Sequence, residues 1–283
     1  MLKQRIITAL ILLALLLPAL FASQPEAFAF LTLILIGAGA WEWGRMNGLG
    51  PMASLLSGAL GLAGCGALWF GGWIAESLPS MWLMAGSAWV LLSGWMLLRG
   101  VAGWAQWPVA PRWTLGLMAL CMAWLALVQA RWLGPNFLLS VLVLVWAADV
   151  FAYFAGRALG GRWIKAKLAA SISPGKSWEG VIGGMVGVLI VSLFWVQADR
   201  HFEFAVPSFH TRLWQQGGWF WLAALVFMTA MSVVGDLVES LIKRSAGVKD
   251  SSGLLPGHGG VLDRVDALLP TLPLAMMLVS WTA

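Results

Sequence analysis

Nine long apolar runs divide this chain, and they limit its possible folds more than any other feature. A helix needs about 20 consecutive, mostly apolar residues to cross a bilayer. The runs that approach this length lie at 6–22, 27–43, 52–70, 81–98, 113–130, 137–155, 181–198, 219–238 and 267–282. Only 10% of the residues are charged, whereas soluble domains contain roughly 25%. We therefore expect an all-α polytopic membrane protein with about nine transmembrane helices, and a soluble enzyme is excluded.

The basic residues predict how these helices are oriented. If the N-terminus is cytoplasmic and all nine runs cross, every one of the 17 lysines and arginines lies inside except Arg131, Arg200 and Arg212. Cytoplasmic loops of membrane proteins carry such an excess of positive charge. We expect a cytoplasmic N-terminus and an outer C-terminus. The net charge of +5 then reflects these loops, and we expect no nucleic-acid partner.

The scarce charge is concentrated in two windows, 149–179 and 236–266, which are both cytoplasmic in this topology. Basic loops explain the lysines and arginines there, but they do not explain the carboxylates. Asp149 and Asp236 each follow an apolar stretch and lie in or at the edge of a predicted span. An acid at that depth costs a few kcal/mol unless it is paired, hydrated or bound to a cation. We take both as functional candidates, with structural pairing as the alternative.

Spacing places several of these charges on common helix faces. Residues at i, i+3, i+4 and i+7 share one face of a helix, and the eighth span has polar residues at that spacing: Asp236, Glu239, Ser240 and Lys243. Asp263 and Asp266 share a face where the ninth helix begins, and Asp149 shares one with Arg157 on the sixth. Carboxylates that meet from two helices suit a hard divalent cation, and Mg²⁺ takes one or two carboxylates plus substrate phosphates.

Two loops in these windows are candidates for binding phosphate. Residues 249–260 are rich in glycine and include His258, Gly259 and Gly260. Successive amides in such a turn can bind an anion. In residues 171–180, two interpretations stay open: a second phosphate contact, or a helix start that Ser177 caps with Glu179 in the first turn.

Gly183 and Gly187 form a G-x-x-x-G pattern in the seventh span. This pattern is typical of close helix packing in membranes. The packing could be within the chain or within a homodimer, and the sequence leaves both open.

The run from Ser240 to Asp266 carries a family resemblance. Its pattern, S-x-x-K-R-x4-K-D-x-S-G…P-G-H-G-G-x-x-D-R-x-D, resembles the C-terminal motif of bacterial phosphatidate cytidylyltransferases, also called CDP-diacylglycerol synthases. Residues 149–157 and 173–180 also fit, except that Gly175 and Ser177 stand where we expect Lys and Thr. The first 130 residues match only in their hydrophobicity.

The resemblance implies an integral enzyme of the bacterial inner membrane whose active site faces the cytoplasm. It would transfer the cytidylyl group of CTP to phosphatidic acid with Mg²⁺, giving CDP-diacylglycerol and pyrophosphate. The implied metal ligands are Asp236 and Asp263, to which we add Asp266 and Glu239. Groups that would act on the phosphates are Lys243, Arg244, Lys249, Asp250, His258 and Arg264. Those that would bind substrate are Ser173, Lys176, Ser240, Gly259, Gly260, Asp149 and Arg157.

We expect residues 1–135, with spans one to five, to be a scaffold. Residues 136–283, with spans six to nine and the cytoplasmic loops 156–180 and 239–266, would form the catalytic region. Two other functions stay open: an ion-coupled transporter that uses Asp149 and Asp236, and another CTP-using membrane lipid transferase or kinase. A monovalent cation beside Mg²⁺ is also left open.

Overall fold

The computed structural model describes residues 2–280 of the chain, and helices dominate this part. They are α1 (Leu2–Phe21), α2 (Glu26–Met46), α3 (Pro51–Phe70), α4 (Pro79–Ala105), α5 (Val109–Leu133), α6 (Pro135–Leu159), α7 (Trp178–Phe202), α8 (Phe209–Gln215), α9 (Gly218–Ser245), α10 (Leu262–Val265) and α11 (Leu268–Ser280). No strand is assigned between residues 2 and 280. The predicted all-α class is confirmed.

Eight of the described helices, α1 to α7 and α9, are long and apolar enough to cross a membrane. The first eight predicted runs correspond to them. The described part of the ninth predicted run, 267–280, corresponds to α11, and residues 281 and 282 of that run lie outside the described part. Helix α11 has 13 residues, which at 1.5 Å per residue span about 20 Å. That is less than the roughly 30 Å of a hydrocarbon core.

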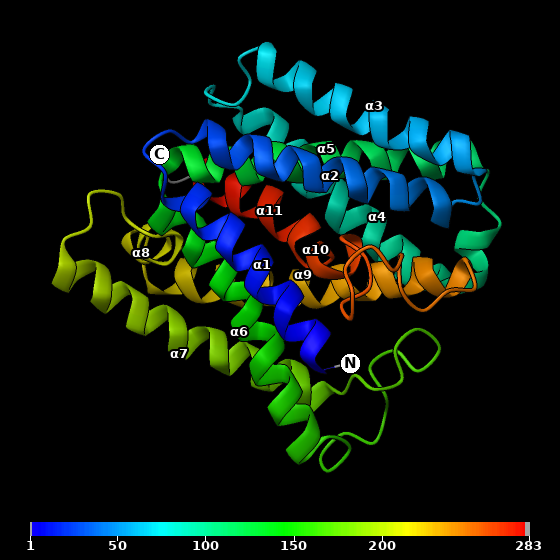
Figure 1. Ribbon diagram of the computed structural model, residues 1–283. Helices are drawn as coiled ribbons and strands as arrows, with labels where there is room; N and C mark the ends of the chain where they lie inside the picture. The colour runs from blue at the N-terminus through cyan, green and yellow to red at the C-terminus, as the bar shows by residue number, and fades with distance from the viewer. Residues whose placement is uncertain (1, 281–283) are drawn as a thin grey trace.

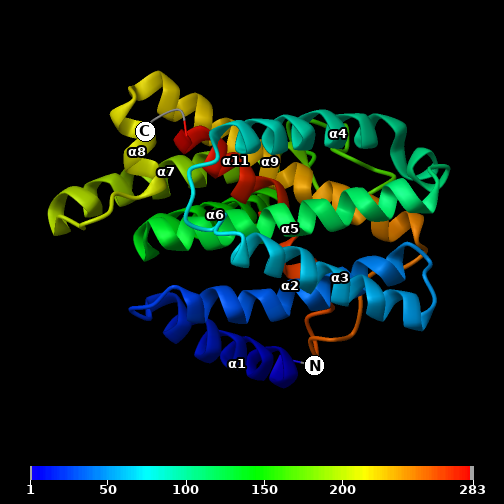
Figure 2. The same cartoon turned by 90° about the horizontal axis from the view of Figure 1, so that it is seen from above.

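The helices run side by side in a layered bundle (Figure 1, Figure 2). Helix α11 is the central element and packs against α4, α5, α6, α8 and α9. Helix α1 lies outside α2 (Figure 2), and α3 lies above α2 and α5 in Figure 1 and contacts both. The loop between α6 and α7 and the loop between α9 and α10 are at the same end of the bundle (Figure 1). This end is where most of the charged residues gather.

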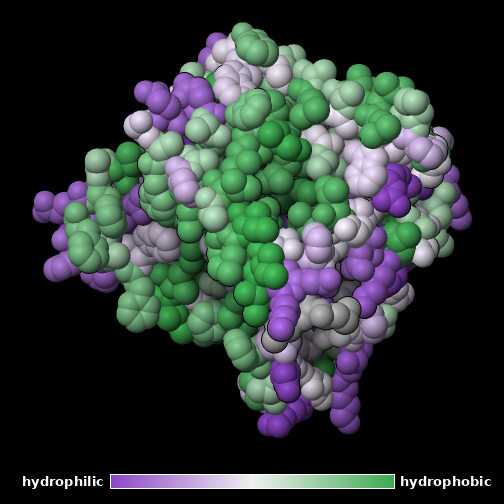
Figure 3. Space-filling model, in the orientation of Figure 1, coloured by the Kyte–Doolittle hydropathy of each residue, from purple (hydrophilic) through white to green (hydrophobic). Residues whose placement is uncertain are grey.

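The surface matches a protein that crosses a membrane. Figure 3 shows hydrophobic side chains in a band across the middle of one face, with hydrophilic ones gathered toward the two ends of the helices. Many large apolar side chains are exposed there, including Leu10 and Leu15 of α1 and Phe154 of α6. Because lipid tails are as apolar as these side chains, their exposure identifies the surface that faces the bilayer.

The glycine pattern of the seventh span serves packing within the chain. A Cβ at Gly183 would overlap Ala155, and one at Gly187 would overlap Phe151. Both partners belong to α6, and α6 with α7 is the most extensive helix pair in the bundle. The short side chains therefore let α6 and α7 approach closely, and no second copy of the chain is needed to explain them.

Local signals set the start of α7. The Ser177 hydroxyl accepts a hydrogen bond from the Gly180 amide at 3.2 Å, which is an N-cap. The Glu179 carboxylate accepts bonds from the amides of Trp163 and Ile164 and so folds the preceding loop back onto the helix. The interpretation of this segment as a helix start is confirmed.

Candidate active site

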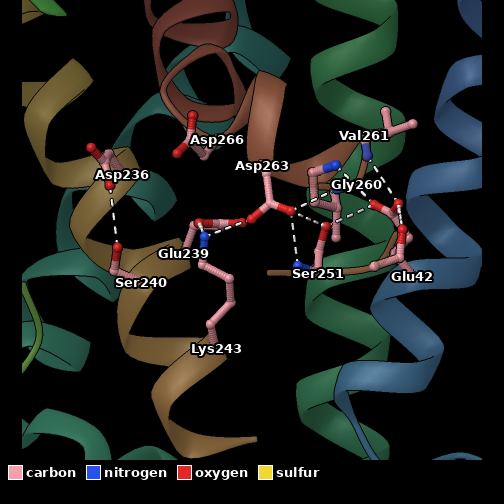
Figure 4. A network of polar contacts seen from close by, with 12 residues as sticks. Glu42, Asp236, Glu239, Ser240, Lys243, Ser251, Gly260, Val261, Asp263 and Asp266 are labelled. Atoms are coloured by element: carbon pink, nitrogen blue, oxygen red, sulfur yellow. Dashed lines mark hydrogen bonds and ion pairs between the residues drawn. The ribbon is translucent and has the colours of Figure 1, made fainter. Parts of the chain in front are cut away.

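The polar face predicted for α9 exists and points toward the start of α10 (Figure 4). Asp236 accepts a hydrogen bond from the Ser240 hydroxyl at 3.2 Å, one turn along. Glu239 is buried. The face continues to Lys243 near the end of the helix. Its residues come together because their spacing follows the helical period.

Lys243 joins α9 to α10. Its ammonium forms ion pairs with Glu239 on its own helix and with Asp263, whose Oδ1 lies 2.7 Å away. All three side chains are largely buried. A positive charge between two buried carboxylates compensates part of the free energy that their burial costs.

A second lysine brings the other charged loop to the same place. Lys176, from the loop before α7, forms an ion pair with Oδ2 of Asp236 at 2.6 Å. The two charged windows of the sequence therefore meet in space. Both side chains are partly exposed, so this pair lies at the open edge of the site.

Asp263 connects the acid cluster to the glycine-rich loop. Its Oδ2 accepts hydrogen bonds from the amide and hydroxyl of Ser251, both at 2.8 Å, and from the amide of Gly260 at 2.7 Å. Burial alone would raise the pKa of this carboxyl. The bonds from Lys243, Gly260 and Ser251 outweigh burial and lower the pKa to about 2. Asp263 is therefore ionised at neutral pH.

Glu42, from α2, holds the same loop from the other side. It is completely buried, and its carboxylate accepts bonds from the hydroxyls of Ser251 and Ser252. It also accepts bonds from the amides of Val261 at 2.9 Å and Leu262 at 2.8 Å. These amides begin α10, so Glu42 fixes the start of the helix that carries Asp263 (Figure 4).

Two glycines are required by this arrangement. Gly259 has a φ of +83°, which side-chain-bearing residues rarely adopt. A Cβ at Gly260 would overlap the Ser251 hydroxyl and the Glu42 carboxylate. Two of the loop amides that we expected to bind phosphate, at Ser251 and Gly260, thus donate to a carboxylate of the chain instead.

Asp149 and Asp266 complete the cluster. Asp266 lies between α10 and α11, outside the eight spanning helices. Burial, followed by repulsion from Asp236 and from Asp149, raises the pKa of Asp266 to about 7. Carboxylates from α6, α9 and the α10–α11 junction are therefore close enough to repel one another. Such a site favours any cation that enters it.

In the described part of the chain, the remaining predicted side chains make no hydrogen bond or ion pair with this cluster. Arg157 donates a hydrogen bond to the Tyr153 hydroxyl at 3.0 Å on the exposed face of α6. Ser173 and His258 are partly exposed. The exposed charged side chains of the α9–α10 region are Arg244, Lys249, Asp250 and Arg264. Exposed basic side chains near an acidic site can contact a polyanion from solution.

In the described part of the chain, no three His, Cys, Asp or Glu side chains are arranged as a metal site. The ammonium groups of Lys176 and Lys243 now lie against Asp236, Glu239 and Asp263. The carboxylates therefore lie close together, and the two lysines neutralise part of their negative charge. The donors are all oxygen atoms, which is the set that Mg²⁺ prefers.

Sequence reasoning missed Glu42, although a signal was present. It lies in the predicted span 27–43 between two tryptophans. The argument that singled out Asp149 and Asp236, that an acid in an apolar run needs a partner, applies equally to Glu42. The contacts of α1 were missed too: Arg5 donates to the carbonyl of Gly257 at 2.9 Å, and Thr8 donates to that of Pro256 at 3.0 Å.

Comparison with known proteins agrees with the resemblance noted in the sequence. A family model described as "Cytidylyltransferase family" matches residues 3–282. A phosphatidate cytidylyltransferase of Pseudomonas aeruginosa is 38% identical over 100% of this chain and 98% of its own length. One of Haemophilus influenzae is 34% identical over 96% of both chains. Matches of this extent, together with the meeting of the two charged windows, show that the chain belongs to the cytidylyltransferase family.

Proposed function

We propose that this membrane enzyme transfers the cytidylyl group of CTP to phosphatidic acid and so makes CDP-diacylglycerol and pyrophosphate. The observation that carries the proposal is the acid cluster of α9 and α10, bordered by basic side chains and held by a glycine-rich loop. Relatives that match nearly the whole chain are named for this activity. A transporter would need the buried acids but has no use for the basic rim.

The chemistry suits these residues. The acceptor is a phosphomonoester that is already largely ionised at neutral pH, so no strong general base is required. The main difficulty is to bring two polyanions together. Lys243 inside the site and Lys176 at its open edge, together with Arg244, Lys249 and Arg264, would neutralise the phosphates. Binding both substrates in one orientation supplies much of the rate acceleration in such transfers.

We propose Mg²⁺ as the cofactor, held by Asp236, Asp263, Asp266 and Glu239. All four offer oxygen ligands, and the mutual repulsion around Asp266 falls when a cation is present. When bound, Mg²⁺ would supply charge neutralisation on the phosphates. The lysines that now pair with these acids would then be free to turn toward the substrates.

We also propose that the site faces the cytoplasm of the bacterial inner membrane, with the N-terminus on the same side. The positive charge gathered at this end of the bundle supports that orientation. So does the source of CTP, which is soluble. In this proposal residues 136–283 carry the chemistry, while residues 1–135 form the scaffold and contribute Glu42 to the site.

The test is incubation of the purified protein with CTP labelled in its α-phosphate and with phosphatidic acid, with Mg²⁺ and with EDTA. We expect labelled lipid and unlabelled pyrophosphate, formed only when CTP, phosphatidic acid and Mg²⁺ are all present. Release of CDP with a phosphorylated lipid alcohol would instead indicate a kinase. No consumption of CTP would overturn the proposal.

A further inference from the structure

An apolar cavity of about 330 Å³ lies beside the acid cluster and has no part in the chemistry described so far. Helices α2, α4, α5 and α9 wall it, together with the first residues of α10 and α11. Among its lining residues only Glu239 is ionisable. Ligand pockets in proteins range from about 300 to 1,000 Å³, so this volume is large enough for part of a small molecule.

The cavity is long and follows α4. Lining residues on this helix extend from Met81 to Met96, about 22 Å at 1.5 Å per residue, and Trp104 lines the cavity beyond the break in the helix at Gly100. Half of a hydrocarbon core is about 15 Å thick. The cavity therefore extends along the helix axis by more than the hydrocarbon thickness of one leaflet.

The two ends of the cavity differ. Toward the charged end of the bundle it reaches Glu239 and Leu262, which are next to Lys243 and Asp263 of the proposed active site. Toward the other end it is lined by apolar side chains such as Met81 and Met122. Its side is open to the bilayer, since Met84 of α4 and Met118 of α5 both line it and are exposed.

We propose that this cavity holds an acyl chain of the lipid substrate while the phosphate of that lipid lies at the acid cluster. The inference rests on the proposed function. An amphiphile with an anionic head and an apolar tail matches a slot that starts at a charged site and continues as an apolar channel beside the bilayer. Because the chain comes from surroundings as apolar as the cavity, the cavity would align the lipid and select its chain length more than raise its affinity.

The alternative occupant, a second copy of the chain, fits the shape less well. A partner helix would lie across the exposed surface of α4, whereas this space is hollowed between helices and continues inward to Glu239. Three small residues, Ala85, Ala88 and Ala119, line the hollow. The wide tryptophan side chains of this region, Trp43, Trp89, Trp95, Trp104 and Trp107, border it.

The test fills the cavity and varies the lipid. In Ala119→Phe and, as an independent variant, Ala88→Phe, an aromatic ring would occupy the channel. The matched control is Ser87→Phe, because Ser87 is exposed on α4 next to Ala88 and does not line the cavity. Each protein is assayed with CTP and either dipalmitoyl or dihexanoyl phosphatidic acid, and its oligomeric state is measured by light scattering.

We expect kcat/KM for the dipalmitoyl lipid to fall by about tenfold or more in the filled variants, because small misplacements of a reacting group carry penalties of that size. The value for the dihexanoyl lipid should change by less than about threefold, since its chains are too short to need the channel. Ser87→Phe should behave as wild type with both lipids.

Equal losses with both lipids in the two filled variants, or no loss with either, would overturn the acyl-chain assignment. Filled variants with a changed oligomeric state but an unchanged preference for chain length would also overturn the assignment. That result would indicate that a second copy of the chain occupies the cavity. Wild-type protein that makes no cytidine-linked lipid from either substrate would overturn the proposed function itself, and the acyl-chain assignment with it.

Discussion

Two kinds of carboxylate meet at the charged end of this protein, and their negative charge is satisfied in different ways. Glu42 is bonded only to neutral donors, two hydroxyls and two amides, all in the loop from Ser251 to Leu262. Asp236 and Glu239 are instead paired with lysines. A carboxylate with four neutral donors is fixed in place, whereas an ammonium can be exchanged for another cation.

Asp263 belongs to both kinds. Its Oδ2 faces the loop and is held by Ser251 and Gly260, while its Oδ1 faces Lys243. The difference between its two oxygens shows how the site is built. The bonds to Oδ2 position the loop, whereas Oδ1 presents negative charge toward the space between α9 and α10. We therefore expect mutations on the Glu42 side to reduce stability and activity together, and mutations on the Asp236 side to reduce activity alone.

The largest effect is expected for Asp236→Asn. Loss of a ligand that helps neutralise reacting phosphates should lower kcat by on the order of a thousandfold, because several kcal/mol of electrostatic stabilisation are at stake and each 1.36 kcal/mol is a factor of ten. The midpoint of thermal unfolding in detergent should change by little, since Asp236 is partly exposed and repels Asp266. A stability loss in Asp236→Asn as large as the one expected for Glu42→Ala would contradict the difference between the two kinds of carboxylate.

Glu42→Ala should have the next largest effect. It leaves the buried amides of Val261 and Leu262 without their acceptor, and each unsatisfied buried group costs about 1–3 kcal/mol. We expect the free energy of unfolding to fall by about 3 kcal/mol or more, together with activity. The control is Glu26→Gln, an exposed glutamate of the same helix, which should leave both properties unchanged. Wild-type stability in Glu42→Ala would show that the loop does not depend on this residue.

Gly260→Ala tests the close approach of the loop to both acids. The added methyl would overlap Ser251 and Glu42, so we expect activity to fall by about tenfold, with a stability loss of about 1–3 kcal/mol from strain. Gly253→Ala is the matched control, because it lies in the same loop and a Cβ there meets nothing within 4 Å. The measurements are the activity and the thermal unfolding of both variants. Equal activity and equal unfolding midpoints in Gly260→Ala and Gly253→Ala would contradict the packing described.

Lys176→Ala should have the smallest effect on stability. The pair that Lys176 forms with Asp236 is partly exposed, and such pairs contribute about 0–1 kcal/mol. We expect the unfolding midpoint to stay close to that of wild type while the KM for one of the two anionic substrates rises. A large drop in the unfolding midpoint would mean that this lysine is structural, like the donors around Glu42.

The sequence was sufficient to predict most of the fold because membrane helices show as apolar runs. It could not show that α10 and the start of α11 lie beside the acid cluster. Irregular backbone is tolerated within a membrane protein when protein groups satisfy it, and Glu42 and Asp263 do so here. Hydropathy cannot predict such irregular backbone here, because its stability depends on hydrogen bonds between Glu42 and amides more than 200 positions away.

The candidate site was predicted in part, for related reasons. Residues on one helix, such as Asp236 and Lys243, were placed together by the helical period alone. The ion pair of Lys176 with Asp236 could not be predicted from local spacing, since it depends on how α6 and α7 pack against α9. The glycine-rich loop was recognised as a motif, but the spacing of its glycines could not show that Gly260 faces carboxylates of the chain.

The most direct test of the central claim, that the lysine-paired acids form a cation site, is binding of Mn²⁺ in place of Mg²⁺, followed by electron paramagnetic resonance. We predict saturable binding to wild-type protein, a dissociation constant at least about tenfold weaker in Asp236→Asn, and an unchanged one in the control Glu26→Gln. Identical Mn²⁺ affinity in wild type, Asp236→Asn and Asp263→Asn would contradict the account.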